Sequence, residues 1–521
     1  MAATALLSRP FNGAIKGIEV VGNKLPHPMY LFIYLFAAIA VLSTVLAATG
    51  ASVTVPGSGE QVAVQGFFSV EGLLWFLQNF VQNFISFPPL VTVILMVMAV
   101  GVAERTGLIN AAIVALFARA PRWLVPYAVG IIACQAHIIS DVAMIVVPAL
   151  AALVFLKAGR NPIAGLIGSV ACVSAGYSGG VLLGALDTLL VGITEKAVAI
   201  LPGSSAHTSL LMNYFYTSVS GLILGVLGGF LIDRFLEPRC PAPAPESLTA
   251  FSVPEQMTGS GQTPRDMTLT ALQRRGLLAS VLAVVLYTGG LATAWVWPGS
   301  PLQGKGGTLV PSPLLSAMIL VIFTGFILTA VVYGVAARTL TSKIQIPEMM
   351  TEAVRTVAPY VVFVFVIAQA LALFTWSNVG TLLAVNMAAS FESIGLTGFG
   401  AIMVFVLLAC ILNLLITSGS ALWSLLAPVF VPGFMLLGMS PAVTQAAFRI
   451  GDSVSQPLTP MNAMLLVVLT MLQKYEPDAK LGTLISRNAI FAIPFFVVWT
   501  LILAIFYFLD LPLGPGASIH L

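Results

Sequence analysis

The sequence predicts an all-α polytopic membrane protein with about nine transmembrane helices and two re-entrant hairpins, arranged as inverted repeats with broken helices. Three observations lead to this fold class. The 521-residue chain is 59% hydrophobic and only 8% charged, whereas about 25% of the residues in a soluble domain are charged. Its mean hydropathy is +1.02. Apolar runs long enough to cross a bilayer recur along the chain, and several are interrupted by small and polar residues.

Charge and cysteine content exclude several classes of function. The net charge of +3 is small and spread along the chain, so the composition gives no reason to expect a nucleic-acid partner. The four cysteines lie far apart without a CxxC spacing, and the four histidines form no cluster with them. No metal site, disulfide framework or organic cofactor is therefore predicted.

Residues 1–86 are predicted to hold one span and one interfacial helix. Basic residues in the first 27 positions precede an apolar run at 28–49 that lacks a cleavage site. We therefore expect a retained first span with a cytoplasmic N-terminus. The segment 69–86 alternates apolar and amide residues with a helical period, which favours a helix at the membrane surface.

Residues 87–236 form the first predicted repeat, which starts with a span at 87–103. The next apolar stretch, 122–157, is too long for one ordinary span, has basic residues at both ends and contains the polar motif QAHIISD. We interpret it as a re-entrant hairpin that enters from the cytoplasm and turns near Ser140 and Asp141.

A broken helix follows in that repeat. Residues 163–200 resemble one span interrupted by the small-residue motif SAGYSGG at 174–180, with Asp187 just beyond the break. A further span at 209–233 has a basic end. It leads into residues 237–272, whose Pro, Ser, Gly and charged residues are typical of a flexible cytoplasmic linker.

Two scaffold spans are predicted within residues 273–344, at 273–297 and 313–337. The second predicted repeat, residues 345–521, then opens with an amphipathic segment and a span at 357–376.

The hairpin and the broken helix recur in this second repeat. The stretch 396–437 is again too long for one crossing and is interrupted at 417–420. No basic residues flank it, so this hairpin is expected to enter from the outside. Residues 441–473 form a span broken by GDSVSQPLTP. A last span, 488–509, leaves the C-terminus outside.

The two halves share spacing as well as hydropathy. Ser140 and Pro148 are eight residues apart, as are Ser420 and Pro428. Because the two hairpins enter from opposite sides, the halves form an inverted repeat, which is the layout of secondary transporters. Such carriers bind their substrate where the broken helices meet. The chain has no GxxxxGK[ST] loop, so nothing suggests that ATP drives transport.

Polar residues are concentrated at the expected membrane depth between positions 413 and 461. Arg449 and Asp452 are three residues apart, which places a guanidinium and a carboxylate on one face of a helix. Small, hydroxylated and proline residues interrupt the helical pattern around Ser420 and Pro457. Charges and broken helices at this depth indicate a site for a solute or an ion.

Six motifs are long enough to compare with known families. They are GNKLPHPMYLF (22–32), GVAERTGLI (101–109), GALDTLLVGIT (184–194), FTWSNVG (374–380), LNLLITSGSALWSLLAPVFVPGFMLLG (412–438) and SPAVTQAAFRIGDS (440–453). Together they resemble the p-aminobenzoyl-glutamate transporter family, AbgT, over nearly the whole chain. The resemblance implies a homodimer in the bacterial inner membrane, with nine spans and two hairpins per protomer and a periplasmic C-terminus. It also implies ion-coupled movement of p-aminobenzoyl-glutamate, or export of sulfonamide antimetabolites by an antiporter.

The same resemblance points to individual site residues. They are Asp187, Asn413, Ser420, Trp423, Pro441, Arg449, Asp452 and Pro457. The planar donor fork of Arg449 suits a carboxylate or sulfonyl group, and the flat face of Trp423 suits an aminobenzoyl ring. The expected substrate is a small aromatic anion or a sulfonamide.

A coupling ion, H⁺ or Na⁺, also has candidate residues. Asp452 and Asp187 could take it up, because a carboxylate in a low-dielectric cavity can be tuned to bind either ion. Opened carbonyls near Ser420, Gly451 and Ser453 could complete a Na⁺ site with Asp452.

Each site residue also has a purely structural interpretation. Arg449 and Asp452 could form a buried ion pair that joins helices. Asp187 could simply be hydrogen-bonded at the helix break, Trp423 could be a packing residue, and Asn413 could be a contact between helices.

This sequence departs from the expected family pattern near the predicted site. Gly180 stands in place of an expected amide, and Ser455 and Gln456 stand in place of an expected Thr-Asn pair. The substrate, the coupling ion and the direction of transport are therefore left open. A carrier of another small organic anion, such as a dicarboxylate, is the main alternative. A passive channel would not need mirrored broken helices, and the GxSxG or HExxH motif of an intramembrane enzyme is missing.

Overall fold

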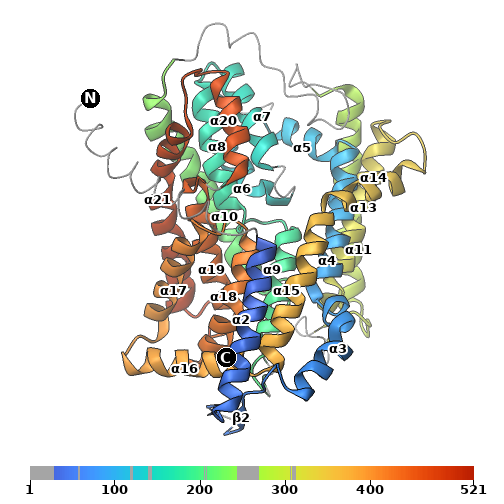
Figure 1. Ribbon diagram of the computed structural model, residues 1–521. Coiled ribbons are helices and arrows are strands. Elements are labelled where there is room, and N and C mark those ends of the chain that lie inside the picture. The colour runs from blue at the N-terminus through green and yellow to red at the C-terminus, as the bar shows by residue number, and fades with distance from the viewer. Residues whose placement is uncertain are drawn as a thin grey trace, which may run out of the picture.

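Helices make up most of the described chain in this computed structural model (Figure 1). The structure describes residues 28–56, 59–117, 121–138, 143–202, 204, 206, 208–242, 269–304, 307, 312–460 and 462–521. Among these residues, eight helices are long and apolar enough to cross a membrane, or nine if one bent pair counts as a single span. The predicted polytopic helical membrane fold is confirmed.

Some predicted features lie outside the described residues. They are the N-terminal segment 1–27, the first hairpin tip at Ser140 and Asp141, and positions 243–268 of the linker.

The N-terminal part contains the expected spans and one feature that was not expected. Its elements are α2 (Pro28–Ala48), β1 (Ser52–Thr54), β2 (Gln61–Ala63), α3 (Val70–Ile85) and α4 (Pro88–Arg105). Strands β1 and β2 pair antiparallel between α2 and α3, a small hairpin that the sequence analysis did not predict. Each strand is only three residues long, too short for a periodic pattern to reveal it.

The first half continues with short helices and one full-length span. Its elements are α5 (Leu108–Phe117), α6 (Val125–Gln135), α7 (Ala143–Lys157), α8 (Pro162–Gly176), α9 (Ala185–Val198) and α10 (Tyr214–Leu231), followed by the π-helical turn η2 (Ile232–Leu236) and the 3-10 turn η3 (Glu237–Arg239). The predicted linker start at position 237 is too early, because Glu237 is still helical and forms an ion pair with Arg160.

The second half has the same mixture of long and short helices. Its elements are α11 (Ala271–Val296), α12 (Pro313–Ser316), α13 (Met318–Ala336), α14 (Gln345–Thr356), α15 (Ala358–Trp376), α16 (Val379–Ser393), α17 (Gly398–Asn413), α18 (Gly419–Leu436), α19 (Pro441–Ser455), the 3-10 turn η7 (Gln456–Leu458), α20 (Ala463–Gln473) and α21 (Leu481–Phe508).

Helix α16 was missed by the sequence analysis. It lies across the lower end of the bundle in Figure 1 and is bent by 120° from α17. It begins after Asn378, whose φ of 60° is left-handed, and it ends shortly before Gly395 with a φ of 66°. These two turns isolate a helix whose mixed polar composition gives no clear span signal.

The two halves of the chain place their short helices at opposite ends of the bundle. In Figure 1, α6, α7 and α8 lie in the upper half and α9 in the lower half, whereas α17, α18 and α19 lie in the lower half and α20 in the upper half. This arrangement is what an inverted repeat requires. The re-entrant nature of the two hairpins and the side from which each enters stay predictions.

Helices α8 and α19 form the centre of the protein. Every residue of both helices is buried, although α19 carries an arginine, an aspartate, a glutamine and several hydroxyl groups. A fully buried helix with these residues needs internal partners for them, because unpaired polar groups are costly away from water.

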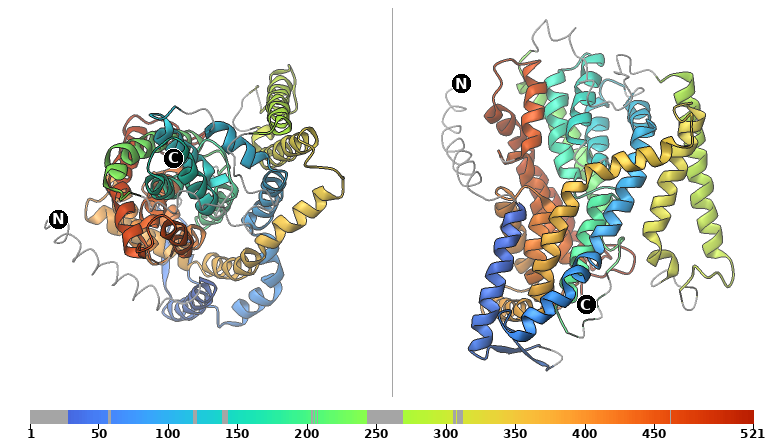
Figure 2. Two further views of the ribbon diagram at one scale, coloured as in Figure 1. Left: turned by 90° about the horizontal axis from the view of Figure 1, so that it is seen from above. Right: turned by 45° about the vertical axis from the view of Figure 1, so that its right-hand side comes forward.

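Close helix crossings depend on glycine. A Cβ atom added to Gly225 of α10 would lie 2.7 Å from the Cα atom of Ile131 in α6. Glycine therefore lets the two backbones touch, as in other membrane helix pairs. Helices α11 and α13, in contrast, stand at one side of the bundle (Figure 2). Only 6% of the residues in the apolar, membrane-spanning stretch of α11 are buried.

Candidate functional site

A buried ion pair joins the two broken helices. Nη1 of Arg449, in the middle of α19, lies 2.8 Å from Oδ1 of Asp187 in the first turn of α9, and the two side chains are 3% and 8% exposed. The pair connects residues 262 positions apart in the sequence. It therefore fastens the break of the first half to the buried helix of the second half.

Most of the remaining groups of this pair are also bonded, and Nε of Arg449 has no partner among the described residues. Arg449 donates to the carbonyl of Ser178 at 3.0 Å and to Oε1 of Gln445 at 3.2 Å. The backbone N–H of Gly184 donates to Oδ2 of Asp187 at 2.8 Å. A carboxylate at the N-terminus of α9 is also favoured by the helix dipole. Both charges are thus neutralised inside the protein.

The predicted role of Arg449 as the substrate fork stays a prediction. Its guanidinium is buried against Asp187, and it does not line any of the described cavities. The structural alternative, an ion pair between Arg449 and Asp452, does not occur, because within the described part of the chain Arg449 forms its ion pair with Asp187. Position along one helix predicted the face of Arg449 but not its distant partner.

Polar side chains extend the pair into a network that sequence analysis missed. Nε2 of Gln445 donates to Oγ1 of Thr194 at 2.8 Å, and Nδ2 of Asn213 donates to Oε1 of Gln445 at 2.8 Å. Gln445 lies four residues before Arg449 and so shares its helix face. This four-residue spacing was the feature of the sequence that could have indicated the contact between Gln445 and Arg449. Asn213 and Thr194 have no such signal, because their partners lie far away in the sequence.

Trp423 belongs to this network and not to a cavity wall. It is 0% exposed, and its indole N–H donates to the carbonyl of Leu190 and to Oγ1 of Thr194, both at 3.1 Å. Its ring packs on Phe448 with 4.6 Å between the centroids. In this structure Trp423 is therefore a packing and hydrogen-bonding residue, and its role as a platform for an aminobenzoyl ring stays a prediction.

Asp452 lies beside the tip of the second hairpin. Oγ of Ser178 donates to its Oδ2 at 3.2 Å, and a Cβ atom added to Gly419 would lie 2.8 and 2.9 Å from its two carboxylate oxygens. Oδ1 of Asp452 has no hydrogen-bond partner among the described residues. Asp452 is 0% exposed, so one glycine separates this carboxylate from the space beyond the tip.

More unpartnered oxygen atoms lie around Asp452. Asn413 donates through Nδ2 to the carbonyl of Asp452 at 2.5 Å and to Oγ of Ser455 at 2.9 Å. Oδ1 of Asn413 and Oγ of Ser453 are buried, and neither has a hydrogen-bond partner in the part of the chain described. The described residues hold no cluster of three metal-ligating His, Cys, Asp or Glu side chains. A bound ion here would therefore rest on one carboxylate with amide, hydroxyl and carbonyl oxygens.

The largest described cavity lies directly beyond the hairpin tip. Its volume is about 730 Å³, and it is lined by one face of α4, by α14 and α15, and by the breaks in both helix pairs. This volume lies within the range of about 300–1,000 Å³ that is common for small-molecule sites. Of the predicted site residues, Ser420 lines it, and so does Gln456, one of the departures from the family pattern.

Two predicted prolines lie in different places. Pro457 is buried in the turn η7 that breaks the helix after α19. Pro441 is the first residue of α19, about 16 Å along the helix from Asp452 at 1.5 Å per residue. Its neighbour Ser440 donates to the carbonyl of Ser518 in the C-terminal tail at 2.6 Å. Pro441 is therefore not brought together with the other predicted residues.

The comparisons with known proteins agree over the whole length. The model of the AbgT transporter family matches residues 14–521. The chain belongs to the AbgT family.

Three relatives of this AbgT protein are informative. The p-aminobenzoyl-glutamate transport protein of Escherichia coli (strain K12) is 38% identical over 519 residues, which cover 99% of each chain. The crystal structure of the YdaH transporter of Alcanivorax borkumensis matches with a TM-score of 0.84 and 29% identity, covering 94% of this chain and 100% of that one. MtrF of Neisseria gonorrhoeae, described with a class of antimetabolite efflux pumps, matches with a TM-score of 0.88 and 33% identity, covering 96% and 99%. The protein is thus an integral membrane transporter, and its role is transport rather than catalysis.

The departure at Gly180 has a steric cause in this AbgT chain. A Cβ atom added there would lie 2.8 Å from Nδ1 of His137 and 3.1 Å from Oε1 of Gln135. His137 in turn lies 2.5 Å through Nε2 from the carbonyl of Leu182. The glycine therefore makes room for a histidine contact where an amide side chain was expected.

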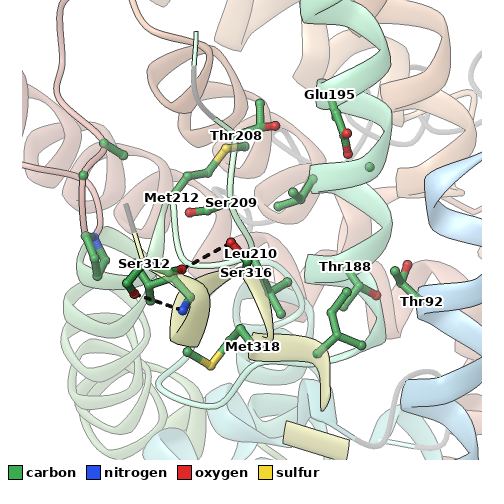
Figure 3. A pocket seen from close by; sticks show the side chains of 17 residues that line it. Thr92, Thr188, Glu195, Thr208, Ser209, Leu210, Met212, Ser312, Ser316 and Met318 are labelled. Atoms are coloured by element: carbon green, nitrogen blue, oxygen red, sulfur yellow. Dashed lines mark hydrogen bonds between the residues drawn. The ribbon is translucent and has the colours of Figure 1, made fainter. Parts of the chain in front are cut away.

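A second, smaller cavity lies against α9, where Figure 3 shows Thr188 and Glu195 among its lining residues. Its volume is about 230 Å³, and Thr92, Thr188, Glu195, Ser209 and Ser316 contribute polar side chains to its wall. This volume is below the usual range for small-molecule sites. The AbgT substrate site is therefore better assigned to the larger cavity.

Proposed function

We propose that this protein is an ion-coupled secondary transporter that carries p-aminobenzoyl-glutamate or exports sulfonamide-type antimetabolites. The names of its relatives in Escherichia coli and Neisseria gonorrhoeae support the class of substrate. The observation that carries the proposal is the placement of Asp452. Its buried carboxylate lies against the hairpin tip that closes one side of a ligand-sized cavity.

Asp452 is the better of the two candidates for ion coupling. The carboxylate of Asp187 is occupied by Arg449 and by the N–H of Gly184, whereas one oxygen of Asp452 has no partner among the described residues. The neighbouring unpartnered atoms of Asn413 and Ser453 are also oxygens, the donor type that hard cations prefer. Either a proton or Na⁺ bound at Asp452 would neutralise its charge and so favour movement of the hairpin tip.

The proposed setting is the bacterial inner membrane, with the N-terminus in the cytoplasm and the C-terminus in the periplasm. Basic residues follow the ends of α4, α7 and α10. The positive-inside rule places these ends in the cytoplasm. The hairpin that contains α6 and α7 then enters from the cytoplasm, and the hairpin that contains α17 and α18 enters from the periplasm.

The proposed assembly is a homodimer. Helix α11 exposes apolar residues along most of its length, and only 6% of the residues in its apolar, membrane-spanning stretch are buried. The helix pair α11 and α13 also stands apart from the rest of the bundle (Figure 2). A second copy of the chain would cover this surface, and lipid would cover what remains of it.

Transport by the purified protein in proteoliposomes tests the proposal. Labelled p-aminobenzoyl-glutamate and a labelled sulfonamide are offered with the pH gradient and the Na⁺ gradient imposed separately and in both directions. Accumulation driven by one of these gradients is the expected result. A passive channel would move the substrate equally fast with and without an ion gradient, and preloaded substrate would drive no counterflow. Uptake of labelled succinate without uptake of labelled p-aminobenzoyl-glutamate would indicate a dicarboxylate carrier.

A further inference from the structure

We propose that Arg105, rather than Arg449, binds the carboxylate of the substrate, and that the cavity along α4 is the place where it does so. This assignment rests on the proposed function and adds to it the residue that selects anionic substrates.

Arg449 is held inside the protein by an ion pair. It is 2% exposed, and its two terminal nitrogens bond to Asp187, Ser178 and Gln445. Its Nε has no partner among the described residues, but this donor is buried beside the ion pair, and drawing Arg449 away from Asp187 would leave a buried carboxylate without its partner. Its side chain is also absent from the wall of the cavity.

Arg105 has the opposite properties. It is partly buried at the last residue of α4, and it lines the cavity. Among the described residues it forms no ion pair within 4.0 Å and no side-chain hydrogen bond. Of the described residues in the cavity wall, Arg105 alone carries a positive charge. A guanidinium in this position offers a planar pair of donors to a carboxylate.

The rest of α4 fits the aromatic part of the same ligand. The residues that face the cavity are Val93, Met96, Val97, Val100, Gly101, Glu104 and Arg105. Along this list the gaps between residues alternate between three and one, a pattern that places the residues on one face of the helix. The face is apolar from Val93 to Val100 and charged only at its end, so it matches a molecule with a ring at one end and a carboxylate at the other.

Aromatic and polar side chains complete the cavity. Tyr177, from the break before α9, and Tyr360, from α15, supply rings to its wall, and such rings favour contact with an aromatic ligand. Ser418, Ser420 and Asn462 supply hydroxyl and amide groups near the hairpin tip. These groups suit the amide bond and the amino group of an aminobenzoyl compound.

Glu104 gives the assignment a second, opposite test. It lines the same cavity and is the one acidic residue among the described wall residues. Glu104 and Arg105 lie on the same cavity-facing side of α4, and their opposite charges attract one another. The negative charge of Glu104 opposes an anionic ligand, so removal of this charge should strengthen binding.

Binding to the purified full-length protein in lipid nanodiscs tests the assignment by calorimetry. The probes are p-aminobenzoyl-glutamate and its dimethyl ester, which keeps the ring and the amide but has no charge. Arg105→Gln is expected to weaken binding of the acid by about ten- to a hundredfold, the range for hydrogen bonds to charged groups. Arg105→Lys should lose less affinity for the acid than Arg105→Gln does, and Glu104→Gln should bind the acid more tightly than the wild type. The ester should bind the wild type and all these variants equally.

Arg355→Gln is the matched control, because this arginine lies on α14 with a side chain that is 71% exposed. It should bind the acid with wild-type affinity. The assignment is overturned if Arg105→Gln binds the acid with wild-type affinity, or if this variant loses affinity for the acid and the ester equally. It is also overturned if Arg355→Gln loses as much affinity for the acid as Arg105→Gln does. Should Arg105→Gln fail to fold, the other two variants provide the test. Affinity for the acid should fall in Arg105→Lys and rise in Glu104→Gln, and the assignment is overturned if either variant fails to do so. Absence of binding to the wild type would instead overturn the proposed substrate class, and this assignment with it.

Discussion

The hydroxyl of Ser178 donates to the carboxylate of Asp452 at 3.2 Å, and the carbonyl of the same serine accepts from Arg449 at 3.0 Å. One residue in the break between α8 and α9 therefore holds both charged side chains of α19. Binding of an ion at Asp452 and the ion pair of Arg449 are connected through this serine. The predictions below separate their contributions.

Asp452→Asn should abolish accumulation against a gradient but leave exchange of preloaded substrate. The amide keeps the shape of the side chain and can still accept from Ser178, but it lacks the charge that binds a cation. Uptake and counterflow in proteoliposomes measure the two activities. The matched control is Asp510→Asn on an exposed turn, where asparagine tolerates the left-handed φ of 50°. Gradient-driven accumulation by Asp452→Asn at the wild-type rate would contradict the coupling role.

Asp187→Asn should destabilise the protein by about 3–5 kcal/mol, because the buried guanidinium of Arg449 loses its counter-charge. Adding Arg449→Gln should recover part of this loss, since no uncompensated charge then remains. Unfolding of the purified variants in one detergent measures the free energies. A double variant whose loss equals the sum of the two single losses would show that the two residues do not interact.

Trp423→Phe should lower stability by about 1–3 kcal/mol, because two buried hydrogen bonds from the indole N–H to Leu190 and Thr194 are lost, each worth about 0.5–1.5 kcal/mol. The phenyl ring still packs against Phe448, and substrate affinity should not change. Thermal unfolding and calorimetric binding are measured on the same sample. Trp297→Phe, at a side chain that is 68% exposed, serves as the control. Weaker binding at unchanged stability would return Trp423 to the substrate site.

Gly419→Ala should reduce transport strongly, because the added methyl group would lie 2.8 Å from an oxygen of Asp452. The hairpin tip or the carboxylate must then move. Gly482→Ala is the control, since nothing lies within 4 Å of a Cβ atom added there. The control should be active and as stable as the wild type or slightly more stable, because alanine is preferred over glycine in helices. Normal ion-driven uptake by Gly419→Ala would show that contact at the tip is not needed.

Hydropathy and composition were sufficient to predict most of the spans and the break in the first half, but not α16. The first span was expected at 28–49 and lies at Pro28–Ala48, because a run of apolar residues of this length can satisfy its backbone in lipid only as a helix. The break in the first half was expected at 174–180, and the structure has no helix between Gly176 and Ala185. Small residues mark such positions in the sequence itself.

The partners of the charged residues could not be predicted in the same way. The spacing of Arg449 and Asp452 predicted that they share a helix face, but the ion pair of Arg449 is with Asp187, on another helix 262 residues away. The burial of Trp423 likewise depends on Leu190 and Thr194 of α9. Contacts of this kind depend on how the helices pack, which periodicity along one segment does not determine.

The complete burial of α19 also limits how the protein can vary. Under the proposed function a bound antimetabolite contacts the cavity wall, so substitutions that change drug preference are expected along α4 and at the hairpin tip. Within α19, substitutions that change side-chain size would disturb packing on every side and reduce the amount of folded protein, whereas a change that keeps the shape, such as Asp452→Asn, would alter coupling. Natural variants with altered drug profiles and normal abundance should therefore carry their differences on the α4 face.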